Sequence, residues 1–466
     1  MIEDLKPYPQ YKDSGLPWLG QVPAHWTVLR IKTVLQETDR RSREGTETLL
    51  SLTRIRGLIP HRDMTKKMHG AKTLVGYKKY RAGQLVMNRM QAWSGMFGAN
   101  ENNGLVSPDY AVFDVLGKHS VQFILERIKS PDLVGQFALE SKGIGSGFNR
   151  LYTDRFGQIA ISLPPPSEQA AIARFLAWAT NRLDRAIGAK RRIIALLQEQ
   201  KQAIIQRAVT RGLDPSVPLK DSGIPWLGEI PEHWEVRRAK YLFREIDDRS
   251  ARGGEELLSV SHMTGVTPRS QKNITMFKAA SYAGHKLCQP GDLVINTMWA
   301  WMGALGTSSY PGIISPAYAV YRPRQMTDII DTYIDFLLRS TPYIANIICQ
   351  STGLHTSRLR LYPEAFFRLP IILPPREEQL LIVDKLKGDT ADLNTAISRL
   401  ESEITLLREY RTRLIADVVT GKLDVREVAK GLPEEELQDQ LDASAGYDAD
   451  EAEDDAESDL IDTAED

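Results

Sequence analysis

Residues 11–26 read YKDSGLPWLGQVPAHW, and residues 219–234 read LKDSGIPWLGEIPEHW. The second copy follows the first at a constant distance of 208 positions, and a match of this length is too long for chance. A repeat has to be recognised before helices and strands are assigned, because it decides how many copies of one unit the chain contains. The repeated phrase therefore predicts an internal duplication.

The correspondence continues well beyond the phrase. At the same offset, LLS at residue 49 recurs at 257, and Gly83, Gly95 and Gly98 recur at 291, 303 and 306. A two-residue insertion then changes the offset to 210, so that LPP at 163 and EQ at 168 recur at 373 and 378. The chain is thus one unit of about 210 residues used twice, which agrees with the two or more domains that 466 residues suggest.

The composition is that of an ordinary soluble protein, with 42% hydrophobic and 26% charged residues. No window approaches the roughly 20 apolar residues that a membrane span needs, and MIEDLKPYPQ has neither the basic head nor the apolar run of a signal peptide. The two cysteines, Cys288 and Cys349, do not suggest a disulfide framework or a zinc site. We therefore expect a protein of the reducing cytoplasm.

Charge is distributed unevenly along the chain. Residues 433–466 contain 16 Asp or Glu and no Lys or Arg, so the preceding 432 residues carry 59 basic against 44 acidic side chains, a net charge of +15. The acidic tail cannot bury enough apolar area to fold, and we expect it to be disordered. The cationic body favours a polyanionic partner such as nucleic acid, although a solvated basic surface without a partner gives the same count.

Each copy has two parts with different periodicities. The first part mixes short apolar runs, such as QLVMN and DLVIN, with Gly, Pro and Asn turns and short helical stretches, which is typical of a mixed α/β domain. The second part follows a proline cluster, PPPSEQ or PPREEQ, of the kind that begins a helix. We therefore expect α/β domains at 1–165 and 213–375, long helices at 166–212 and 376–425, and a disordered tail at 433–466.

Apolar residues in both long helices recur at steps of three and four, which is the pattern of a coiled-coil seam. A helix of about 43 residues would be roughly 65 Å long and needs a partner to bury this seam. The only comparable partner in the chain is the other helix. The predicted seam comprises Ile172, Leu176, Leu183, Ile187, Lys190, Ile194, Leu197, Ile204 and Ala208, paired with Ile382, Leu386, Leu393, Ile397, Leu400, Ile404, Leu407, Leu414 and Val418.

The flanking sequence indicates that the two helices are antiparallel. Leu213-Asp214 leads from the first helix into the second phrase, and Leu423-Asp424 ends the second helix where a third phrase would begin. The first phrase is preceded by Leu5-Lys6-Pro7, which aligns with residues 213–215. If each helix runs from its own domain to the start of the other, the arrangement closes into a pseudo-twofold molecule with a domain at either end of a helical rod.

The phrase contains no obvious catalytic chemistry. Its tryptophans, Trp18, Trp26, Trp226 and Trp234, are interpreted as packing anchors, with a surface docking epitope as the alternative. His25 and His233 have no nucleophile to pair with, so a structural role is favoured. The chain also lacks the GxxxxGK[ST], HExxH and GxSxG motifs, a metal-ligating Cys and His set, and the Asn/Asp-Pro-Pro-aromatic motif of DNA aminomethyltransferases.

Basic and amide side chains concentrate in the segments where the two copies differ. Lys and Arg can contact phosphates, and Arg, Asn and Gln can also read base edges. For any one of these residues, simple solvent exposure is the competing interpretation. The candidate DNA-binding residues are Arg54, Arg56, Arg62, Lys66, Lys67, Lys72, Lys79, Arg89, Gln91 and Arg150 in the first copy and His262, Arg269, Lys272, Lys278, Lys286, Asn296, Arg358 and Arg360 in the second.

The duplicated combination of KDSG(L/I)PWLG, P(A/E)HW and the LPP…EQ helix start resembles the specificity subunit of type I restriction-modification enzymes over nearly the whole chain. The resemblance implies two target-recognition domains, each reading one half of a bipartite, asymmetric site in double-stranded DNA, with the helices as a spacer. It implies that two modification subunits, which bind S-adenosylmethionine and methylate adenine, dock around the helices. The acidic tail lies outside this pattern.

The resemblance further implies that two restriction subunits, which use ATP and Mg²⁺, complete a nuclease and translocase for phage defence. The chain itself would then be non-catalytic and bind no cofactor or metal. Two readings from other classes stay open at this point. The chain could be a DNA methyltransferase or nuclease in its own right, or a coiled-coil scaffold that binds only proteins.

Overall fold

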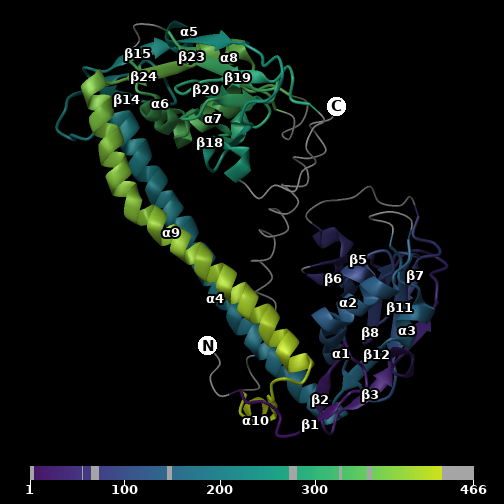
Figure 1. The fold of residues 1–466 in the computed structure, drawn as a ribbon. Coiled ribbons are helices and arrows are strands. Elements are labelled where there is room, and N and C mark those ends of the chain that lie inside the picture. The colour runs from purple at the N-terminus through teal and green to yellow at the C-terminus, as the bar shows by residue number, and fades with distance from the viewer. Residues whose placement is uncertain are drawn as a thin grey trace. The chain divides into compact units, whose positions relative to one another are not determined.

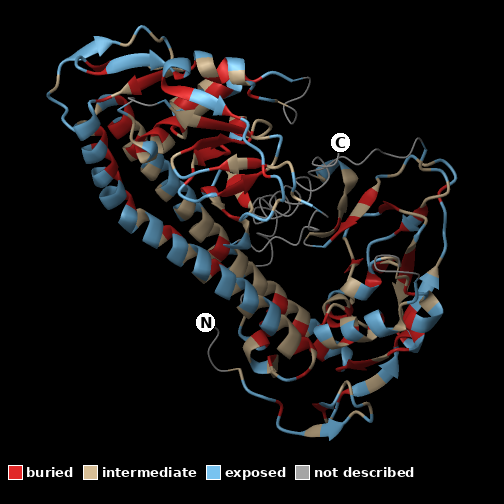
Figure 2. Ribbon diagram, turned by 45° about the horizontal axis from the view of Figure 1, so that its top comes forward, coloured by how far each residue is buried: buried red, intermediate tan, exposed pale blue. Residues whose placement is uncertain are grey.

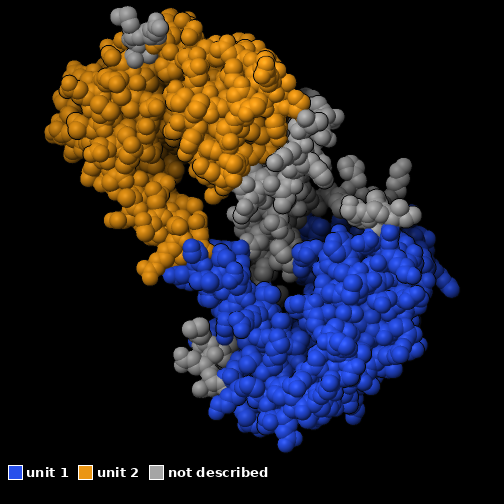
Figure 3. All heavy atoms as spheres, viewed as in Figure 1, with its two compact units in different colours: residues 1–191, 402–466 blue, residues 192–401 orange. Residues whose placement is uncertain are grey.

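The computed structural model describes residues 5–54, 56–64, 73–143, 149–271, 281–324, 328–353 and 359–432. The chain divides into two compact units, one formed by residues 1–191 and 402–466 and the other by residues 192–401 (Figure 3). The helices α4 (Pro166–Arg211) and α9 (Arg376–Val419) are therefore each shared between the units. The acidic tail predicted at 433–466 lies outside the described residues.

The first unit is built on a four-stranded antiparallel sheet in the order β4-β11-β8-β9. Figure 1 labels its two central strands, β11 and β8. Two-stranded ladders join β1 to β2, β3 to β12, β5 to β6 and β7 to β10. The strands are β1 (Tyr11–Asp13), β2 (Gln21–Pro23), β3 (Thr27–Arg30), β4 (Leu35–Thr38), β5 (Leu50–Thr53), β6 (Gly57–Pro60), β7 (Lys78–Tyr80), β8 (Gln84–Asn88), β9 (Phe97–Gly98), β10 (Gly104–Val106), β11 (Tyr110–Val115) and β12 (Ala160–Leu163).

Both faces of this sheet are covered, which explains why β8 reads as a continuous apolar run. Successive side chains of a strand point to opposite faces, so Leu85 and Met87 join the core under the helices, whereas Val86 joins a smaller core under the β5–β6 hairpin. Phe97, Phe137 and Phe156 form the centre of the larger core. The covering helices are α1 (Val121–Ile128), α2 (Pro131–Glu140) and α3 (Thr153–Gln158).

The second unit repeats this plan with the sheet order β16-β23-β20-β21. Leu293 and Ile295 face its larger core and Val294 its smaller one, so the alternation of β8 recurs in β20. The mixed α/β fold expected for each copy is thereby confirmed. Its elements are β13 (Leu219–Asp221), β14 (Glu229–Pro231), β15 (Glu235–Arg238), α5 (Ala239–Leu242), β16 (Phe243–Ile246), β17 (Leu258–Ser261), β18 (Gly265–Pro268), β19 (Lys286–Cys288), β20 (Leu293–Ile295), β21 (Leu305–Thr307), β22 (Gly312–Ile314), β23 (Ala319–Pro323), α6 (Asp331–Leu338), α7 (Thr341–Gln350), α8 (Pro363–Arg368) and β24 (Pro370–Leu373).

The long helices pair in the antiparallel sense. In the first unit, Lys190 Nζ lies 2.5 Å from Glu403 Oε2, and Arg411 lies 3.5 Å from Asp184. In the second unit, Lys201 Nζ donates to Asn394 Oδ1 over 2.7 Å. Rising numbers in α4 thus pair with falling numbers in α9, as expected.

The predicted seam is also confirmed, because each of its residues is buried or half-buried (Figure 2). The one charged member, Lys190, is accommodated by its ion pair with Glu403. None of the helices in the described ranges has the length and apolarity that crossing a membrane requires.

Candidate nucleic-acid interface

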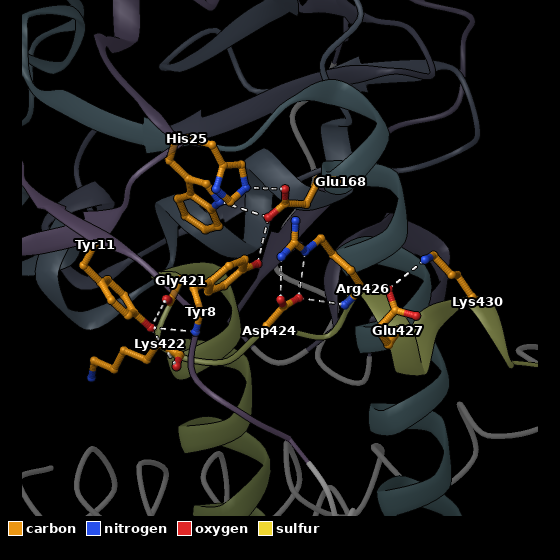
Figure 4. A network of polar contacts seen from close by, with 11 residues as sticks. Tyr8, Tyr11, His25, Glu168, Gly421, Lys422, Asp424, Arg426, Glu427 and Lys430 are labelled. Atoms are coloured by element: carbon orange, nitrogen blue, oxygen red, sulfur yellow. Dashed lines mark hydrogen bonds and ion pairs between the residues drawn. The ribbon is translucent and has the colours of Figure 1, made fainter.

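The repeated phrase holds each domain to the start of its long helix. The buried carboxylate of Glu168, in the first turn of α4, accepts hydrogen bonds from Trp26 Nε1 at 3.0 Å and from the Tyr8 hydroxyl at 2.7 Å, both on Oε1 (Figure 4). His25 Nε2 lies 2.7 Å from the other oxygen, Oε2. Burial, together with the bond to Glu168, raises the pKa of Tyr8. The glutamate of the LPP…EQ motif is therefore the partner of the HW pair.

The second unit contains the same joint with one contact fewer. Glu378 accepts from Trp234 Nε1 at 3.1 Å and lies 2.7 Å from His233 Nε2. Ser216 occupies the sequence position that corresponds to Tyr8. Trp26 and Trp234 are fully buried, which confirms the packing interpretation of the phrase for these two residues. Both histidines serve the joint, consistent with the structural role that the sequence favours.

The end of α9 closes the first unit without a covalent link. The Asp424 amide donates to the Lys6 carbonyl over 2.7 Å, and the Tyr11 hydroxyl donates to the Gly421 carbonyl over 3.1 Å. Gly421 has φ of +80°, and a Cβ there would lie 2.6 Å from Pro23 Cδ, so this approach requires glycine. In the second unit the end of α4 is joined covalently to the start of the second phrase, because the chain continues directly from Asp214. The predicted closure is confirmed within the first unit.

Three segments of the first unit converge to form one surface. They are the tip of the β5–β6 hairpin, the loop 88–95 after β8, and residues 149–152. The Arg54 guanidinium donates to Ser94 Oγ over 3.2 Å, and the Leu151 amide donates to the Arg89 carbonyl over 2.9 Å. We call these three segments the loop surface of the first unit.

In the second unit the segments that correspond in sequence are the β17–β18 hairpin tip, the loop 296–303 and residues 359–362, which we call its loop surface. Here the Leu361 amide donates to the Thr297 carbonyl over 2.9 Å, and Arg360 reaches Met298 Sδ at 3.8 Å. Both domains therefore present side chains from the same three places.

A glycine allows each hairpin to lie against the sheet beside the loop. A Cβ on Gly98 would lie 2.5 Å from Leu52 Cδ1 of one hairpin, and a Cβ on Gly306 would lie 3.3 Å from Gly265 Cα of the other. In each loop a tryptophan also bonds back to the backbone, from Trp93 Nε1 to the Met90 carbonyl and from Trp301 Nε1 to the Met298 carbonyl. Residues that both copies share thus build the loop, which leaves its other positions free to differ.

The two loop surfaces carry different chemistry at corresponding positions. Arg54, Gln91 and Ser94 of the first copy correspond to His262, Trp299 and Met302 of the second. The first set offers hydrogen-bond donors and acceptors, whereas Trp299 stacks on Trp301 with ring centroids 5.8 Å apart. One scaffold therefore displays two different sets of side chains.

The structure spreads the sequence candidates over several environments. Arg54, Arg62, Lys79, Gln91, His262 and Arg360 are exposed, and Arg56, Arg89, Arg150 and Arg269 are half-buried. Lys66, Lys67, Lys72, Lys272, Lys278 and Arg358 lie outside the described residues. Among the described candidates, the loop surfaces bring together Arg54, Arg56, Arg89, Gln91, Arg150, His262, Asn296 and Arg360.

Two candidates are buried, and this corrects the expectation that they reach DNA. The ammonium of Lys286, 8% exposed, lies 3.5 Å from Asp247, and Asn296, 3% exposed, accepts from the Met298 amide at 3.2 Å. Lys78, the counterpart of Lys286, faces Glu37 and Asp39 in the same way, and burial lowers its pKa. The two lysines neutralise acidic groups at the sheet edge, and Asn296 fixes a turn. These residues therefore recur in both copies because the fold needs them.

Tyr152 and Tyr362 were missed as candidates. They hold corresponding positions in the two loop surfaces, and each is 50% exposed. The Arg150 guanidinium lies 5.7 Å from the Tyr152 ring centroid. The sequence contains a hint of this pair, because the dipeptide LY recurs at 151–152 and 361–362. That both tyrosines are exposed can be seen only in the structure.

No family model matches the chain. Over 102 residues it is 34% identical to the type I restriction enzyme MjaVIII specificity subunit of Methanocaldococcus jannaschii, a match that covers 22% of each chain. A chain from a solved type I restriction-modification system superposes with a TM-score of 0.57 at 16% identity, covering 86% of this chain and 99% of that one. Over these 102 residues the chain is similar to a type I specificity subunit.

The likeness to the solved type I chain is one of fold and covers 86% of this chain, whose own fold comprises two domains and two long helices. The HsdS subunit from Thermoanaerobacter tengcongensis is a further structural neighbour, with a TM-score of 0.41 and 16% identity over 86% of this chain and 98% of that one. The sequence match, by contrast, spans about a fifth of the length of the curated type I specificity subunit. The resemblance drawn from the repeated motifs is confirmed.

Proposed function

We propose that this chain is the DNA-recognition subunit of a type I restriction-modification complex, in which each domain reads one half of a bipartite site. The observation that carries the proposal is the pair of loop surfaces, which share one backbone design but differ in the side chains that they display. An asymmetric, bipartite DNA site has two different half-sites, so it requires two domains that share a fold but differ in the side chains that contact the bases.

The residues that the two copies share and the residues in which they differ would contact different parts of the DNA. Arg150 and Arg360 recur at corresponding positions, so they suit contacts to the phosphate backbone, which carries no sequence information. Gln91 and Arg54 can form hydrogen bonds to base edges in the major groove. Trp299 and His262 give the second domain a different set of contacts, so its half-site would differ.

The partners and the reaction follow from the proposed role. Two modification subunits would dock around the helices and supply S-adenosylmethionine-dependent methylation, and restriction subunits would supply the ATP- and Mg²⁺-dependent nuclease. The chain itself would be non-catalytic and would act in the cytoplasm, where the DNA lies. The target-recognition domains correspond to 1–165 and 213–375, and the spacer helices to 166–212 and 376–425.

A domain exchange tests the two-reader model. Replacing residues 24–163 by those of a relative, in cells that express the complete system, should change one half of the methylated motif, as read by methylome sequencing. The reciprocal exchange of residues 232–373 is the matched control and should change only the other half. A change in both halves, or in neither, would refute the model.

The two alternatives are tested with the purified chain. Methyl transfer to DNA by this chain alone, with S-adenosylmethionine, would make it an enzyme in its own right. A pure protein scaffold would keep the same weak DNA affinity after Arg54, Arg150 and Arg360 are replaced by alanine together. The proposed function predicts no methyl transfer and a clear loss of affinity.

A further inference from the structure

A single arginine in the second unit fixes the tip of the β17–β18 hairpin to α6. Arg339, the residue that follows α6, donates from Nη2 to the His262 carbonyl over 2.6 Å and to the Met263 carbonyl over 3.0 Å. His262 and Met263 lie in the turn between β17 and β18. One guanidinium thus binds two backbone carbonyls of a segment 76 and 77 positions away in the sequence.

The carboxylate of Asp335 orients this guanidinium. Asp335 lies one turn earlier on α6, and its Oδ2 accepts from Arg339 Nη1 over 3.4 Å. Its other oxygen, Oδ1, accepts from the Thr307 amide at the end of β21 over 3.2 Å. Burial raises the pKa of Asp335, and the positive charge of Arg339 opposes this rise. The arginine is therefore connected through one carboxylate to both the helix and the sheet.

An ion pair between residues four apart on a helix often does no more than stabilise the helix slightly. In this case the bonds from Arg339 to the two hairpin carbonyls are shorter than its contact with Asp335. Gly265 of β18 also leaves the space that the guanidinium occupies, because a Cβ there would lie 3.2 Å from Nη1. The hairpin is therefore the principal partner of Arg339.

The backbone of the hairpin turn is fixed, whereas its side chains are exposed. The Ser261 hydroxyl oxygen lies 2.9 Å from the Thr264 hydroxyl oxygen and accepts from the Thr264 amide over 3.1 Å. Between them, the side chains of His262 and Met263 are exposed, that of Met263 to 68%. A segment whose backbone is ordered before binding loses less conformational freedom when its side chains contact a ligand.

The first copy fixes its hairpin in a different way. It has Leu125 and Lys129 at the positions of Asp335 and Arg339, and Leu125 packs against the apolar core. Its hairpin tip is instead joined to the loop after β8 by the bond from Arg54 to Ser94. The contact that fixes each tip thus differs between the copies, as do the side chains that the tips display.

We propose that Arg339 is a positioning residue for the second recognition domain. Oriented by Asp335, it fixes the hairpin turn so that the side chains of His262 and Met263 contact base edges in the half-site read by this domain. Arg339 itself reads no base, because its donors bind the hairpin and the carboxylate. This inference rests on the proposed DNA-recognition function and adds to it the residues that determine how one reading element is held.

Methylation of a library of site variants by the reconstituted complex tests the proposal. Arg339→Gln should lower the preference for the cognate base pairs about tenfold, at the same positions of one half-site that His262→Ala with Met263→Ala relaxes. The preference in the other half should be unchanged. Arg339→Lys keeps a charge beside Asp335, so its thermal unfolding midpoint should stay near that of the wild type. A lysine lacks the planar fork of donors, and the preference should still fall.

The matched control is Lys129→Gln, at the corresponding position of the first copy, which should leave the preference in both halves unchanged. Wild-type preference in both Arg339 variants, with relaxation in His262→Ala with Met263→Ala, would overturn the inference and leave the proposed function intact. So would a loss shared by both half-sites that follows the unfolding midpoint, since Arg339 would then only stabilise the fold. A wild-type complex without any preference for a bipartite site would instead refute the proposed function, and the inference with it.

Discussion

Trp26 and Glu168 are joined by a hydrogen bond in which the indole Nε1 donates to Oε1 over 3.0 Å. Trp26 belongs to the repeated phrase, Glu168 to the first turn of the long helix, and 142 positions separate them. The bond between Trp234 and Glu378 repeats this arrangement. The phrase and the helix motif thus recur together because they are the two halves of one joint.

Loss of the carboxylate should weaken this joint unequally in the two copies. Glu168 accepts three contacts and Glu378 two. We expect Glu168→Gln to destabilise the protein by about 2 kcal/mol and Glu378→Gln by about 1 kcal/mol. Urea unfolding of the full chain measures both, and Tyr8→Phe in the Glu168→Gln background should add little. An equal loss for the two substitutions would contradict the role given to Tyr8.

A buried ion pair should make the first unit sensitive to acid. The Arg127 guanidinium is fully buried and bonds Asp132 at 2.8 and 3.0 Å. Burial alone would raise the pKa of Asp132, but the charge and hydrogen bonds of Arg127 outweigh it and lower that pKa. The pair therefore stabilises the fold above the ordinary pKa of an aspartate, near 4, and this contribution is lost as the pH falls further.

The corresponding test compares Asp132→Asn with the wild type across pH. The substitution leaves Arg127 buried without its counter-ion, so we expect a loss of about 3 kcal/mol at pH 7. The difference from the wild type should begin to shrink as the pH falls below about 4 and should vanish only once the Asp132 carboxylate is protonated in the folded protein as well. Glu235→Gln removes half of an exposed pair with Arg237 and should cost less than about 0.5 kcal/mol at any pH.

The arginines that recur in both loop surfaces should act on the phosphate backbone. Arg150→Ala and Arg360→Ala are each expected to weaken DNA binding to a similar degree for all sequences. Each should also reduce the slope of log affinity against log salt by about 1. Fluorescence anisotropy across a salt series gives both numbers. A loss confined to one sequence would instead identify a base contact.

The residues that differ between the copies should act on one half-site each. Gln91→Ala should relax specificity in the half read by the first domain, and Trp299→Ala in the half read by the second, at a cost of about 1 to 3 kcal/mol for the cognate base pair. Methylation of a library of site variants by the reconstituted complex provides the measurement. Each substitution serves as the control for the other.

The helix pair should set the number of base pairs between the halves. Seven residues inserted both after Lys190 and before Glu403 keep the seam in register and lengthen each helix by about 10 Å, or about three base pairs. Insertion in one helix alone should misalign the seam and lower the unfolding midpoint. An unaltered spacer after the matched insertion would show that the helices do not set this distance.

The sequence was most informative where both copies could be compared. It predicted the duplication, the antiparallel seam and the packing role of Trp26 and Trp234, because these follow from periodicity and repetition. It failed for Lys286 and Asn296, since recurrence alone does not separate a residue that builds a turn from one that binds a ligand. The convergence of the hairpin tip with the loop after β8 depends on a close approach at Gly98, which only the three-dimensional structure reveals.

The contact between Lys6 and Asp424 also has a consequence for synthesis on the ribosome. Residues 192–401 are contiguous, so the second unit has all its parts once residue 401 has left the exit tunnel. The first unit, although translated earlier, lacks its closing segment until residues 402–430 have been made. The unit whose sequence is translated first is therefore the last to be completed. Its N-terminal segment can pair with Asp424 only after the end of α9 has been synthesised.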